Sequence, residues 1–382
     1  MAYTVLARRY RSRSFDEVVG QEMIARTLKA AIEQNKVAHA YLFSGTRGVG
    51  KTSMARIFAD ALNNPEGKED IAQAIFTGQD TDTIEIDGAS NRGVDEAREV
   101  IANSVYRPLR GEYKIYIIDE VHMLTKEAFN ALLKTMEEPP EHVKFILCTT
   151  EPHKVPPTIQ SRCQRFDFRN IPSGKIEDHL EAVVKQEGLK ADAELISAVA
   201  RLGNGSMRDA LSLLDRLIAA GEKKLTLTLL ESLLGLPDRE VIGSLIDAIA
   251  DGDPKTVLEQ GAILVNRTST DQVMEAFLER FRDLMVLAAC GPETDLVELT
   301  GATRKDEAER AQRFDAAGLV HMIALTESVQ RAVKSSSSPR ALFDALLVRL
   351  AMTEKLADVT ALVAGNGAVS SGLSAGTHGK KA

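Results

Sequence analysis

The residues best suited to chemistry form a glycine-rich stretch at positions 45–52, with the sequence Gly-Thr-Arg-Gly-Val-Gly-Lys-Thr. The stretch fits the pattern G-x-x-x-x-G-K-[ST], in which glycines let backbone amides approach phosphate oxygens closely. Lys51 would neutralise the β- and γ-phosphates of a nucleotide, and the Thr52 hydroxyl would bind Mg²⁺. An apolar run at 40–43 precedes the stretch and a helical pattern follows it, which disfavours the alternative of a chance glycine-rich turn.

Two neighbouring carboxylates, Asp119 and Glu120, follow an apolar run at 114–118. A carboxylate at a strand end is placed to hold the Mg²⁺ of a nucleotide, mostly through water, and we assign this role to Asp119. Glu120 would orient and polarise the attacking water, which predicts hydrolysis as well as binding. The alternative is an acidic N-cap on the next helix. His122 is expected to be a surface or packing residue and not a catalytic one.

Alternating strands and helices must position these residues. Short apolar runs have the composition of strands, and helical spacing between them is clearest from Ala128 to Met136. The predicted strands are 40–43, 83–86, 114–118 and 143–148. This alternation predicts a parallel sheet covered by helices on both faces.

The pattern becomes helical after residue 162. The first amphipathic helices are predicted at 175–186, 191–202 and 206–219, with a break at Gly203–Asn204–Gly205. Nearly all of 225–358 is predicted to be helical, with breaks near Pro237, at 251–254 and at 335–339. Residues 364–382 are rich in Gly, Ser and Ala and predict a disordered tail.

Composition sets the remaining limits. The chain has 382 residues, a length that predicts two to three domains, and 44% of them are hydrophobic, which is enough for more than one core. The sequence contains no long apolar run, so we predict neither a membrane span nor a secretory signal. Three widely separated cysteines favour a reducing, cytoplasmic location over a disulfide framework. The net charge of −8 restricts any nucleic-acid contact to a local basic surface, and arginines crowd the amino terminus.

Longer motifs resemble the gamma/tau subunit family of the bacterial DNA polymerase III clamp loader, a family of AAA+ ATPases. Residues 7–11 and 15–21 resemble the nucleotide-base region of clamp-loader subunits. The stretches that look like gamma/tau in particular are 39–52, 118–124, 130–140, the SRC motif at 161–163 and the sensor-2 helix at 205–211. The likeness extends from about residue 3 to about residue 358.

This resemblance implies an α/β P-loop (AAA+) domain with a parallel sheet, followed by a helical lid and an all-α collar. The expected boundaries are 1–170 for the ATPase domain, 171–224 for the lid, 225–360 for the oligomerisation collar and 361–382 for the tail.

The resemblance also implies roles for three residues. Thr150 aligns with sensor 1, which responds to the γ-phosphate, and Arg208 aligns with sensor 2, which reaches the bound phosphate from the lid. Arg162 aligns with an arginine finger that enters a neighbouring subunit's ATP site, where it is worth about 10³–10⁵ in rate. The alternatives are a backbone-satisfying hydroxyl for Thr150, a surface salt bridge for Arg162 and a solvated helix position for Arg208.

The resulting candidate site has three groups of residues. The expected ATP-binding residues are Ala7, Arg11, Val19, Gly45, Thr46, Arg47, Gly48, Val49, Gly50, Lys51, Thr52, Ser53 and Arg208. The expected catalytic residues are Lys51, Glu120, Thr150 and Arg162, and the expected Mg²⁺ ligands are Thr52 and Asp119.

One departure from the family concerns a four-cysteine zinc module that usually follows the P-loop helix. Residues 63–82 contain no cysteine, whereas structural Zn²⁺ needs about four N or S ligands. We therefore predict no zinc and a solvated connection here, with acidic residues at Glu66, Glu69, Asp70 and Asp80. The sequence stops shortly after the expected collar, without the long extension of tau, and is expected to be either the short gamma form or a shortened piece of a longer chain.

The implied function is ATP-dependent opening of a sliding clamp and its loading onto primer–template DNA. The implied partners are delta-type and delta-prime-type subunits, further copies of this chain, the clamp and DNA, at the replication fork and away from any membrane. The candidate DNA contacts are Arg92, Arg98, Arg107 and Arg110, with ordinary solvated arginines as an equal alternative. Two rival functions stay open, a branch-migration or remodelling AAA+ motor and a non-catalytic scaffold subunit.

Overall fold

The computed structural model describes residues 3–90, 93, 100–297, 299 and 301–352. The chain divides into two units, Met1–Thr226 and Leu227–Ala382, and each has a hydrophobic core of its own. The two units are described separately below.

A five-stranded parallel sheet forms the centre of the first unit, with the strand order β2-β3-β4-β1-β5. The strands are β1 (Ala40–Ser44), β2 (Thr83–Asp87), β3 (Lys114–Asp119), β4 (Val143–Thr149) and β5 (Gln164–Asp167). The inner strands β1, β3 and β4 are buried along most of their length, which explains their continuous apolar runs. The four predicted strands are confirmed, and each ends one residue later than expected.

The edge strand β5 was not predicted. Its sequence, Gln-Arg-Phe-Asp, has one apolar residue and no alternating pattern, and most of it is exposed. Pairing with β1 defines it, with Tyr41 opposite Gln164 and Ser44 opposite Asp167. A strand of this kind is set by its neighbour and not by its own composition.

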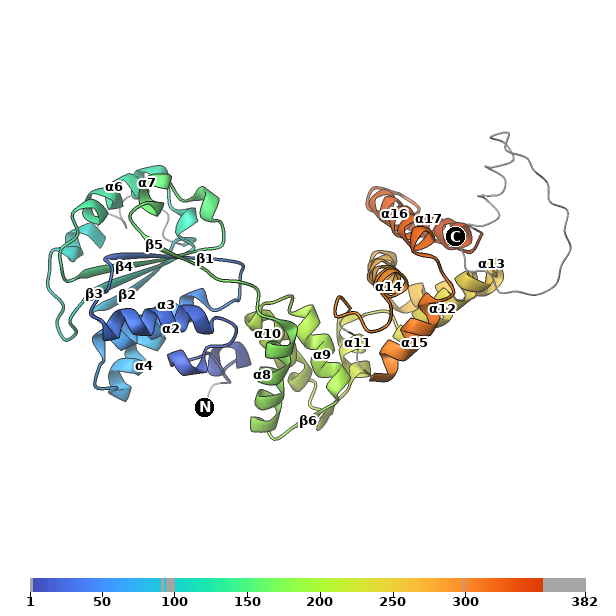
Figure 1. Ribbon diagram of the computed structural model, residues 1–382, viewed down its shortest axis with the longest axis horizontal. Helices are drawn as coiled ribbons and strands as arrows, with labels where there is room; N and C mark the ends of the chain where they lie inside the picture. Colours follow the sequence, from blue (N-terminus) through green and yellow to red (C-terminus); the bar gives the residue numbers. More distant parts are fainter. Residues whose placement is uncertain (1–2, 91–92, 94–99, 298, 300, 353–382) are drawn as a thin grey trace, which may run out of the picture. The chain divides into compact units, whose positions relative to one another are not determined.

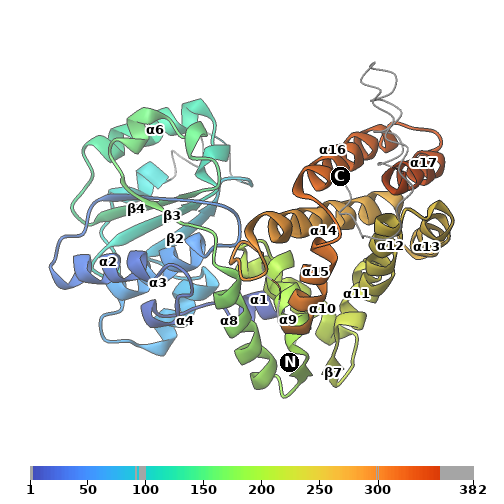
Figure 2. The ribbon, with the colours of Figure 1, turned by 45° about the vertical axis from the view of Figure 1, so that its right-hand side comes forward.

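Helices cover both faces of the sheet, as Figures 1 and 2 show. One face carries α2 (Glu22–Glu33), α3 (Lys51–Asn63) and α4 (Glu69–Thr77), and the other carries α6 (Lys126–Glu137) and α7 (Pro157–Gln160). Successive side chains of β1 alternate between the two cores: Tyr41 and Phe43 enter the first, Ala40 and Leu42 the second. The predicted parallel sheet with helices on both faces is therefore confirmed.

The helix α4 corrects the expectation of a plain solvated connection at 63–82. Asn64 holds the turn before it by accepting a hydrogen bond from the Lys68 backbone N–H and donating to the Lys68 carbonyl. Ile75 is buried in the core beside α3, so the segment is anchored by an apolar contact. Its acidic residues lie mostly on the exposed side, as expected for the solvated face of an amphipathic helix.

Helices close the first unit after the sheet. They are α8 (Ser173–Gln186), α9 (Ala193–Leu202) and α10 (Met207–Ala219), with the two-residue strands β6 (Lys190–Ala191) and β7 (Lys224–Leu225) beside them. These three helices were predicted, with starts within two residues of those observed. The short helix α1 (Leu6–Arg9), near the amino terminus, packs against α10.

The second unit is helical throughout the residues that the structure describes. Its helices are α11 (Leu227–Leu234), α12 (Arg239–Asp251), α13 (Pro254–Arg267), α14 (Thr270–Cys290), α15 (Gly301–Ala311), α16 (Ala316–Val333) and α17 (Pro339–Ala351). Side-chain caps mark several starts, because the Asp238, Asp253, Ser269 and Asp315 side chains accept hydrogen bonds from first-turn amides. For the described residues up to 352, the predicted helical region and its three breaks are confirmed, and a further break between Cys290 and Gly301 was not predicted. The rest of that region and the predicted tail at 361–382 lie outside the described residues.

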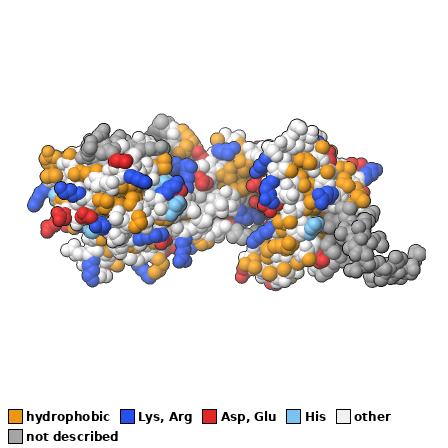
Figure 3. Space-filling model, turned by 90° about the horizontal axis from the view of Figure 1, so that it is seen from above, with side chains coloured by type: hydrophobic (Ala, Val, Ile, Leu, Met, Phe, Trp, Pro, Cys, Tyr) orange, Lys and Arg blue, Asp and Glu red, His pale blue; other side chains and the backbone are white. Residues whose placement is uncertain are grey.

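The surface is mixed in charge. On the face drawn in Figure 3, acidic and basic side chains are interspersed with apolar ones over the described surface. In the described part of the chain, none of the helices has the length and apolarity that crossing a membrane requires.

Candidate functional site

The glycine-rich loop joins β1 to α3, so the sheet fixes its start and a helix N-terminus fixes its end. Gly45 and Gly48 have φ values of 149° and 78°, which side chains rarely adopt. A Cβ at Gly45 would lie 2.5 Å from the Phe168 carbonyl oxygen, and one at Gly48 would lie 1.9 Å from Ser206 Oγ. Glycine is therefore required both for the turn and for the approach of the helices that follow the sheet.

Lys51 begins α3 and turns back over this loop. Its side chain donates hydrogen bonds of 2.8 Å to the carbonyl oxygens of Gly45 and Thr46. The residue is only 6% exposed, and this burial lowers the pKa of the Lys51 amine, while the nearby carboxylates Asp119 and Glu120 act in the opposite direction. A buried cation in a cradle of backbone amides is suited to a phosphate group.

Asp119 meets the loop at the carboxyl end of β3. The Thr52 hydroxyl donates a 2.7 Å hydrogen bond to Asp119 Oδ2, which confirms that the two expected metal ligands lie together. Burial raises the pKa of Asp119, and the hydrogen bonds from Thr52 and the Glu120 amide partly oppose that shift. Both side chains present oxygen atoms, which Mg²⁺ prefers.

Glu120 follows in an unusual backbone conformation, with a φ of 47°. Non-glycine residues in this region are strained, and such strain is often found at functional sites. The Thr150 hydroxyl and amide donate hydrogen bonds of 2.9 and 3.2 Å to Glu120 Oε2. The structure thus brings the expected sensor 1 residue to the expected water-activating carboxylate.

His122 lies behind this pair, and of the two expected positions, surface or packing, the structure shows packing. The turn Val121–Met123 folds the ring back over β4, where its side chain is only 6% exposed. His122 Nδ1 lies 3.1 Å from Thr149 Oγ1 and 3.3 Å from Glu120 Oε2, and Nε2 lies 3.3 Å from Glu151 Oε1. The ring therefore packs between two carboxylates, consistent with the packing interpretation.

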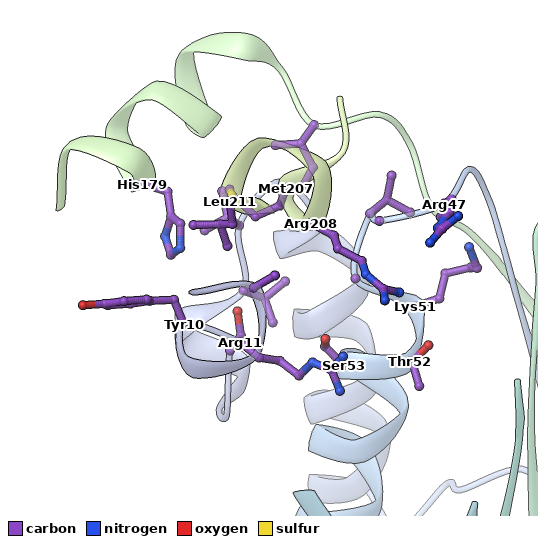
Figure 4. A pocket seen from close by; sticks show the side chains of 18 of the residues that line it. Tyr10, Arg11, Arg47, Lys51, Thr52, Ser53, His179, Met207, Arg208 and Leu211 are labelled. Atoms are coloured by element: carbon purple, nitrogen blue, oxygen red, sulfur yellow. The ribbon is translucent and has the colours of Figure 1, made fainter. Parts of the chain in front are cut away.

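A cavity of about 520 Å³ opens beside the loop (Figure 4). Its polar end is lined by Arg47, Gly48, Val49, Gly50, Lys51, Thr52, Ser53, Asp87, Asp119, Glu120 and Arg208. Its other end is mainly apolar and is lined by Ala7, Tyr10, Val18, Val19, Ile171, His179, Met207 and Leu211, with Arg11 and Ser12 nearby. A volume of this order can take a nucleotide-sized ligand.

Most of the predicted ATP-binding residues line this cavity. Gly45 and Thr46 do not line it, but they hold the Lys51 amine through their carbonyl groups. Sequence analysis placed Tyr10, Val18, Met207 and Leu211 within the motifs at 7–11, 15–21 and 205–211 without naming them as site residues, and it missed Ser12, Asp87, Ile171 and His179. The available signal was weak: Met207 and Leu211 are four residues apart and so share one face of α10.

Arg208 reaches the loop from the first turn of α10. The Ser206 side chain caps this helix by accepting a hydrogen bond from the Asp209 amide. The Arg208 amide in turn lies 3.4 Å from the Gly48 carbonyl oxygen, and the side chain lines the polar end of the cavity near Lys51 (Figure 4). The placement of Arg208 agrees with a sensor 2 role, which stays a prediction.

Two carboxylates tie the amino-terminal segment to the helices after the sheet. Asp215 on α10 accepts hydrogen bonds from the Tyr3 hydroxyl and the Leu6 amide. Glu187, at the end of α8, pairs with Arg9 and accepts a hydrogen bond from the Tyr10 hydroxyl. These contacts hold α1 in place, so the cavity residues around it depend on distant parts of the chain.

Arg162 lies outside the cavity of its own chain. Its guanidinium donates hydrogen bonds of 2.6 Å to Glu137 Oε1 and 2.7 Å to the Thr158 carbonyl oxygen, and its side chain is 33% exposed. This surface ion pair is the alternative foreseen for Arg162. It leaves an exposed guanidinium outside this chain's cavity, and the role in a neighbouring subunit stays a prediction.

The four arginines expected to contact DNA differ in their surroundings. Arg92 and Arg98 lie outside the described residues, Arg107 is exposed, and Arg110 pairs with the nearly buried carboxylate of Asp80. Among described residues, no group of three or more His, Cys, Asp or Glu side chains could hold a metal ion. The absence of zinc stays a prediction.

Family comparisons cover almost the whole chain. The family described as "DNA polymerase III, delta subunit" matches residues 20–172. "DNA polymerase III clamp loader subunit, ATPase lid domain" matches 175–223, and "DNA polymerase III subunits gamma and tau domain III" matches 225–365.

Curated relatives agree with these families. DNA polymerase III subunit tau of Bacillus subtilis is 39% identical over 363 residues, which cover 92% of this chain and 64% of that protein. The tau subunit of Escherichia coli is 43% identical over 265 residues, covering 68% and 41%. The gamma subunit of Buchnera aphidicola is 40% identical over 265 residues, covering 68% and 73%. The chain thus spans less than two thirds of the length of the two tau proteins.

Among solved structures, the RuvB Holliday junction branch migration motor of Thermotoga maritima is similar, with a TM-score of 0.46 and 18% identity over 63% of this chain and 79% of that one. The DNA clamp loader delta protein of Bacillus subtilis has a TM-score of 0.38 and 15% identity over 85% and 99% of the two chains. The sequence relatives, at 39–43% identity, are the matches that decide the family. On these matches, the chain belongs to the gamma/tau family of DNA polymerase III clamp-loader subunits.

Proposed function

We propose that this chain binds and hydrolyses MgATP as a motor subunit of a clamp loader. The main support for the proposal is that two hydrogen-bonded pairs of side chains lie together beside the glycine-rich loop. Thr52 bonds Asp119, and Thr150 bonds Glu120, with Lys51 buried alongside. A mere binding loop would not need the second pair, because Glu120 and Thr150 lie where an attacking water must be oriented.

The residues present fit a magnesium nucleotide. Asp119 and Thr52 offer oxygen ligands for the metal ion, and the buried Lys51 amine offers a positive charge for the phosphates. When bound, Mg²⁺ would neutralise charge on the β- and γ-phosphates. Thr52 and Asp119 are the residues that would hold it.

The chain's own residues account for the chemistry. Lys51 and the loop amides would bind and orient the phosphates, and Arg208 would add charge from the side of α10. Glu120, held by Thr150, would accept a hydrogen bond from the attacking water and increase its nucleophilicity. Arg162 of a neighbouring copy would stabilise the charge that develops on the transferred phosphoryl group.

We extend the proposal to the assembly that this motor would drive. ATP binding would favour a ring of subunits that opens a sliding clamp and grips primer–template DNA, and hydrolysis would release the loaded clamp. The work comes from the different affinities of the ATP and ADP states for clamp and DNA. The lid match at 175–223 and the gamma/tau domain III match at 225–365 support a lid at 171–224 and an oligomerising collar at 225–360.

The first test measures nucleotide affinity of the purified chain by calorimetry with ATP and Mg²⁺. Lys51→Ala should weaken binding by at least about a hundredfold, because it removes the buried cation that faces the phosphates. Lys36→Ala, at an exposed lysine, is the matched control. An unchanged affinity in Lys51→Ala, or no Mg²⁺-dependent affinity in the wild type, would contradict the proposal.

The second test measures clamp loading. The chain is combined with delta-type and delta-prime-type subunits, a sliding clamp and primed DNA, and clamps retained on circular DNA are counted. Loading should require ATP and Lys51. A complex that hydrolyses ATP on DNA but leaves the clamp in solution would favour the rival function of a remodelling motor.

For DNA, we propose a phosphate contact at the exposed Arg107, whereas Arg110 is already engaged by Asp80. Arg107→Ala should lower the affinity of the complex for primed DNA a few-fold and reduce its salt dependence. Arg110→Ala should change the salt dependence less, and the reverse order would contradict this assignment.

A further inference from the structure

The apolar end of the cavity contains one polar ring with no partner. We define the base slot as the apolar side chains Ala7, Val18, Val19, Ile171, Met207 and Leu211. His179 on α8 also lines this end, and Figure 4 shows its ring directed toward Tyr10 and beside Leu211. His179 Nε2 is buried and makes no hydrogen bond in the described part of the chain.

An orphaned buried nitrogen calls for an explanation, because leaving such a group without a partner costs about 1–3 kcal/mol. The other buried side-chain atoms in the same situation are His39 Nε2, Thr83 Oγ1, Tyr116 Oη and Asp271 Oδ1. None of those four described residues lines the cavity. His179 is thus the case in which a ligand could supply the missing hydrogen bond.

The protonation state of the ring narrows the choice of ligand group. Burial lowers the pKa of His179, so the imidazole is neutral at pH 7 and offers one donor and one acceptor nitrogen. A neutral ring in an apolar slot is poorly suited to phosphate. It is well suited to the edge of a nucleobase, where adenine presents an amino donor and guanine presents a carbonyl acceptor at the same position.

We propose that His179 Nε2 accepts a hydrogen bond from the exocyclic amino group of adenine and so sets the preference of this site for ATP. The side chains of the base slot would cover the faces of the adenine ring, and His179 would contact the polar edge of adenine. The inference rests on the proposed ATP-binding function and adds a specificity-determining residue to it.

The test compares purine nucleoside triphosphates that carry different groups at the purine 6-position. ATP carries an amino group there, purine riboside triphosphate carries hydrogen, and GTP carries oxygen at that position and an added 2-amino group. Dissociation constants are measured by calorimetry with Mg²⁺ for the wild type and for His179→Leu, which keeps bulk and removes hydrogen bonding. His153→Leu is the matched control, because that histidine side chain is 73% exposed and does not line the cavity.

The wild type should prefer ATP over purine riboside triphosphate by about tenfold, the usual value of one hydrogen bond to a buried group. His179→Leu should weaken ATP binding by a similar factor, leave purine riboside triphosphate within about twofold and so abolish the preference. His179→Gln keeps a carbonyl acceptor and should restore part of the preference for ATP.

Three results would overturn the inference. Equal losses for both purine nucleotides in His179→Leu would show that the ring only packs, and no loss would show that it has no role. A loss confined to GTP would show that the ring donates to a carbonyl instead. Failure of the ATP site itself is distinguishable, because the wild type would then bind neither nucleotide and Lys51→Ala would change nothing.

Unfolding of the unliganded variants controls for damage to the fold. His179→Leu should have the same midpoint as the wild type or a higher one, since it removes an unpaired polar atom from an apolar environment. If its midpoint falls, His179→Gln alone carries the comparison, and a Gln variant that has no preference for ATP would count against the proposal.

Discussion

The two ends of the cavity are built in different ways. The phosphate end comes from one continuous stretch, residues 47–53, which runs from the loop into α3, together with strand-end residues such as Asp119 and Glu120. The base slot is assembled from the amino-terminal segment, Ile171 and one face of α10. A buried sheet holds the first, whereas side-chain contacts between distant segments hold the second. On the proposed function, the chemical step would take place on the part held by the sheet, and selection of the base on the part that depends on packing.

This difference separates the effects of mutation. Changes at the phosphate end should alter turnover equally for every purine nucleotide, since the phosphates are common to all. Changes at the base slot should alter affinity and base preference while leaving turnover at saturation intact. The predictions below test that division, from the largest expected effect to the smallest.

Arg162→Ala should lower the turnover of the assembled complex by about 10³-fold or more, because a finger supplied in trans stabilises transition-state charge. ATP and purine riboside triphosphate should be affected equally. Nucleotide affinity of the isolated chain should not change, since Arg162 lies outside its own cavity. Arg165→Ala, at an exposed arginine on β5, is the control, and an unaffected Arg162→Ala complex would remove the trans role.

Glu120→Gln should lower turnover by about 10²–10⁴-fold with little change in ATP affinity, since a positioned base acts only in the chemical step. Single-turnover hydrolysis in the assembled complex measures this directly. Glu151→Gln changes a neighbouring carboxylate that also faces His122 and should have a small effect. Similar losses in both variants would mean that the His122 contacts matter more than water activation.

Tyr10→Phe should weaken ATP binding by about two- to fivefold, because it removes the hydroxyl that holds the amino-terminal segment to Glu187. Turnover at saturating ATP should be unchanged. Titration calorimetry and steady-state kinetics measure the two effects, with Tyr106→Phe as the control at a tyrosine that is 68% exposed. A fall in turnover without a change in affinity would break the proposed division between the two ends.

Asp119→Asn should stabilise the nucleotide-free chain at pH 7 by about 0.5–2 kcal/mol while abolishing Mg²⁺-dependent activity. Burial raises the pKa of Asp119, so the ionised form costs the folded state free energy at pH values above its folded pKa. That cost disappears as the pH falls towards the ordinary aspartate value of 3.8, and so should the advantage of the variant. Denaturant unfolding of both proteins at pH 7 and in acid measures the change, and an advantage that grows on acidification would contradict it.

Sequence patterns predicted the phosphate end almost completely. Its geometry is local, because a phosphate loop between a strand and a helix requires glycines at fixed spacing. The apolar run before Asp119 and Glu120 likewise indicated that these two carboxylates lie at the end of a buried strand. The same reasoning located the four strands whose composition reflects burial. It missed β5, whose polar sequence becomes a strand only through pairing with β1.

The base slot could not be predicted in the same way. Tyr10, His179 and Leu211 are far apart in the sequence and meet only after α1, α8 and α10 have packed. Each alone is typical of a helix that buries an apolar face. Family resemblance supplied Ala7, Arg11 and Val19 on the amino-terminal segment and Arg208 on α10, but no pattern singled out His179 on α8 or Met207 and Leu211 on α10.

The strand β5 would have a mechanical consequence in the proposed ring of subunits. It begins two residues after Arg162 and ends at Asp167, whose carboxylate accepts a hydrogen bond from Ser44, and the Phe168 amide donates a 2.7 Å bond to the Ser44 carbonyl. Ser44 directly precedes the phosphate loop. If Arg162 grips a neighbour's nucleotide as proposed, tension on it passes through one short strand to this subunit's own loop. Hydrolysis in one ATP site would then change the phosphate loop of the adjacent subunit.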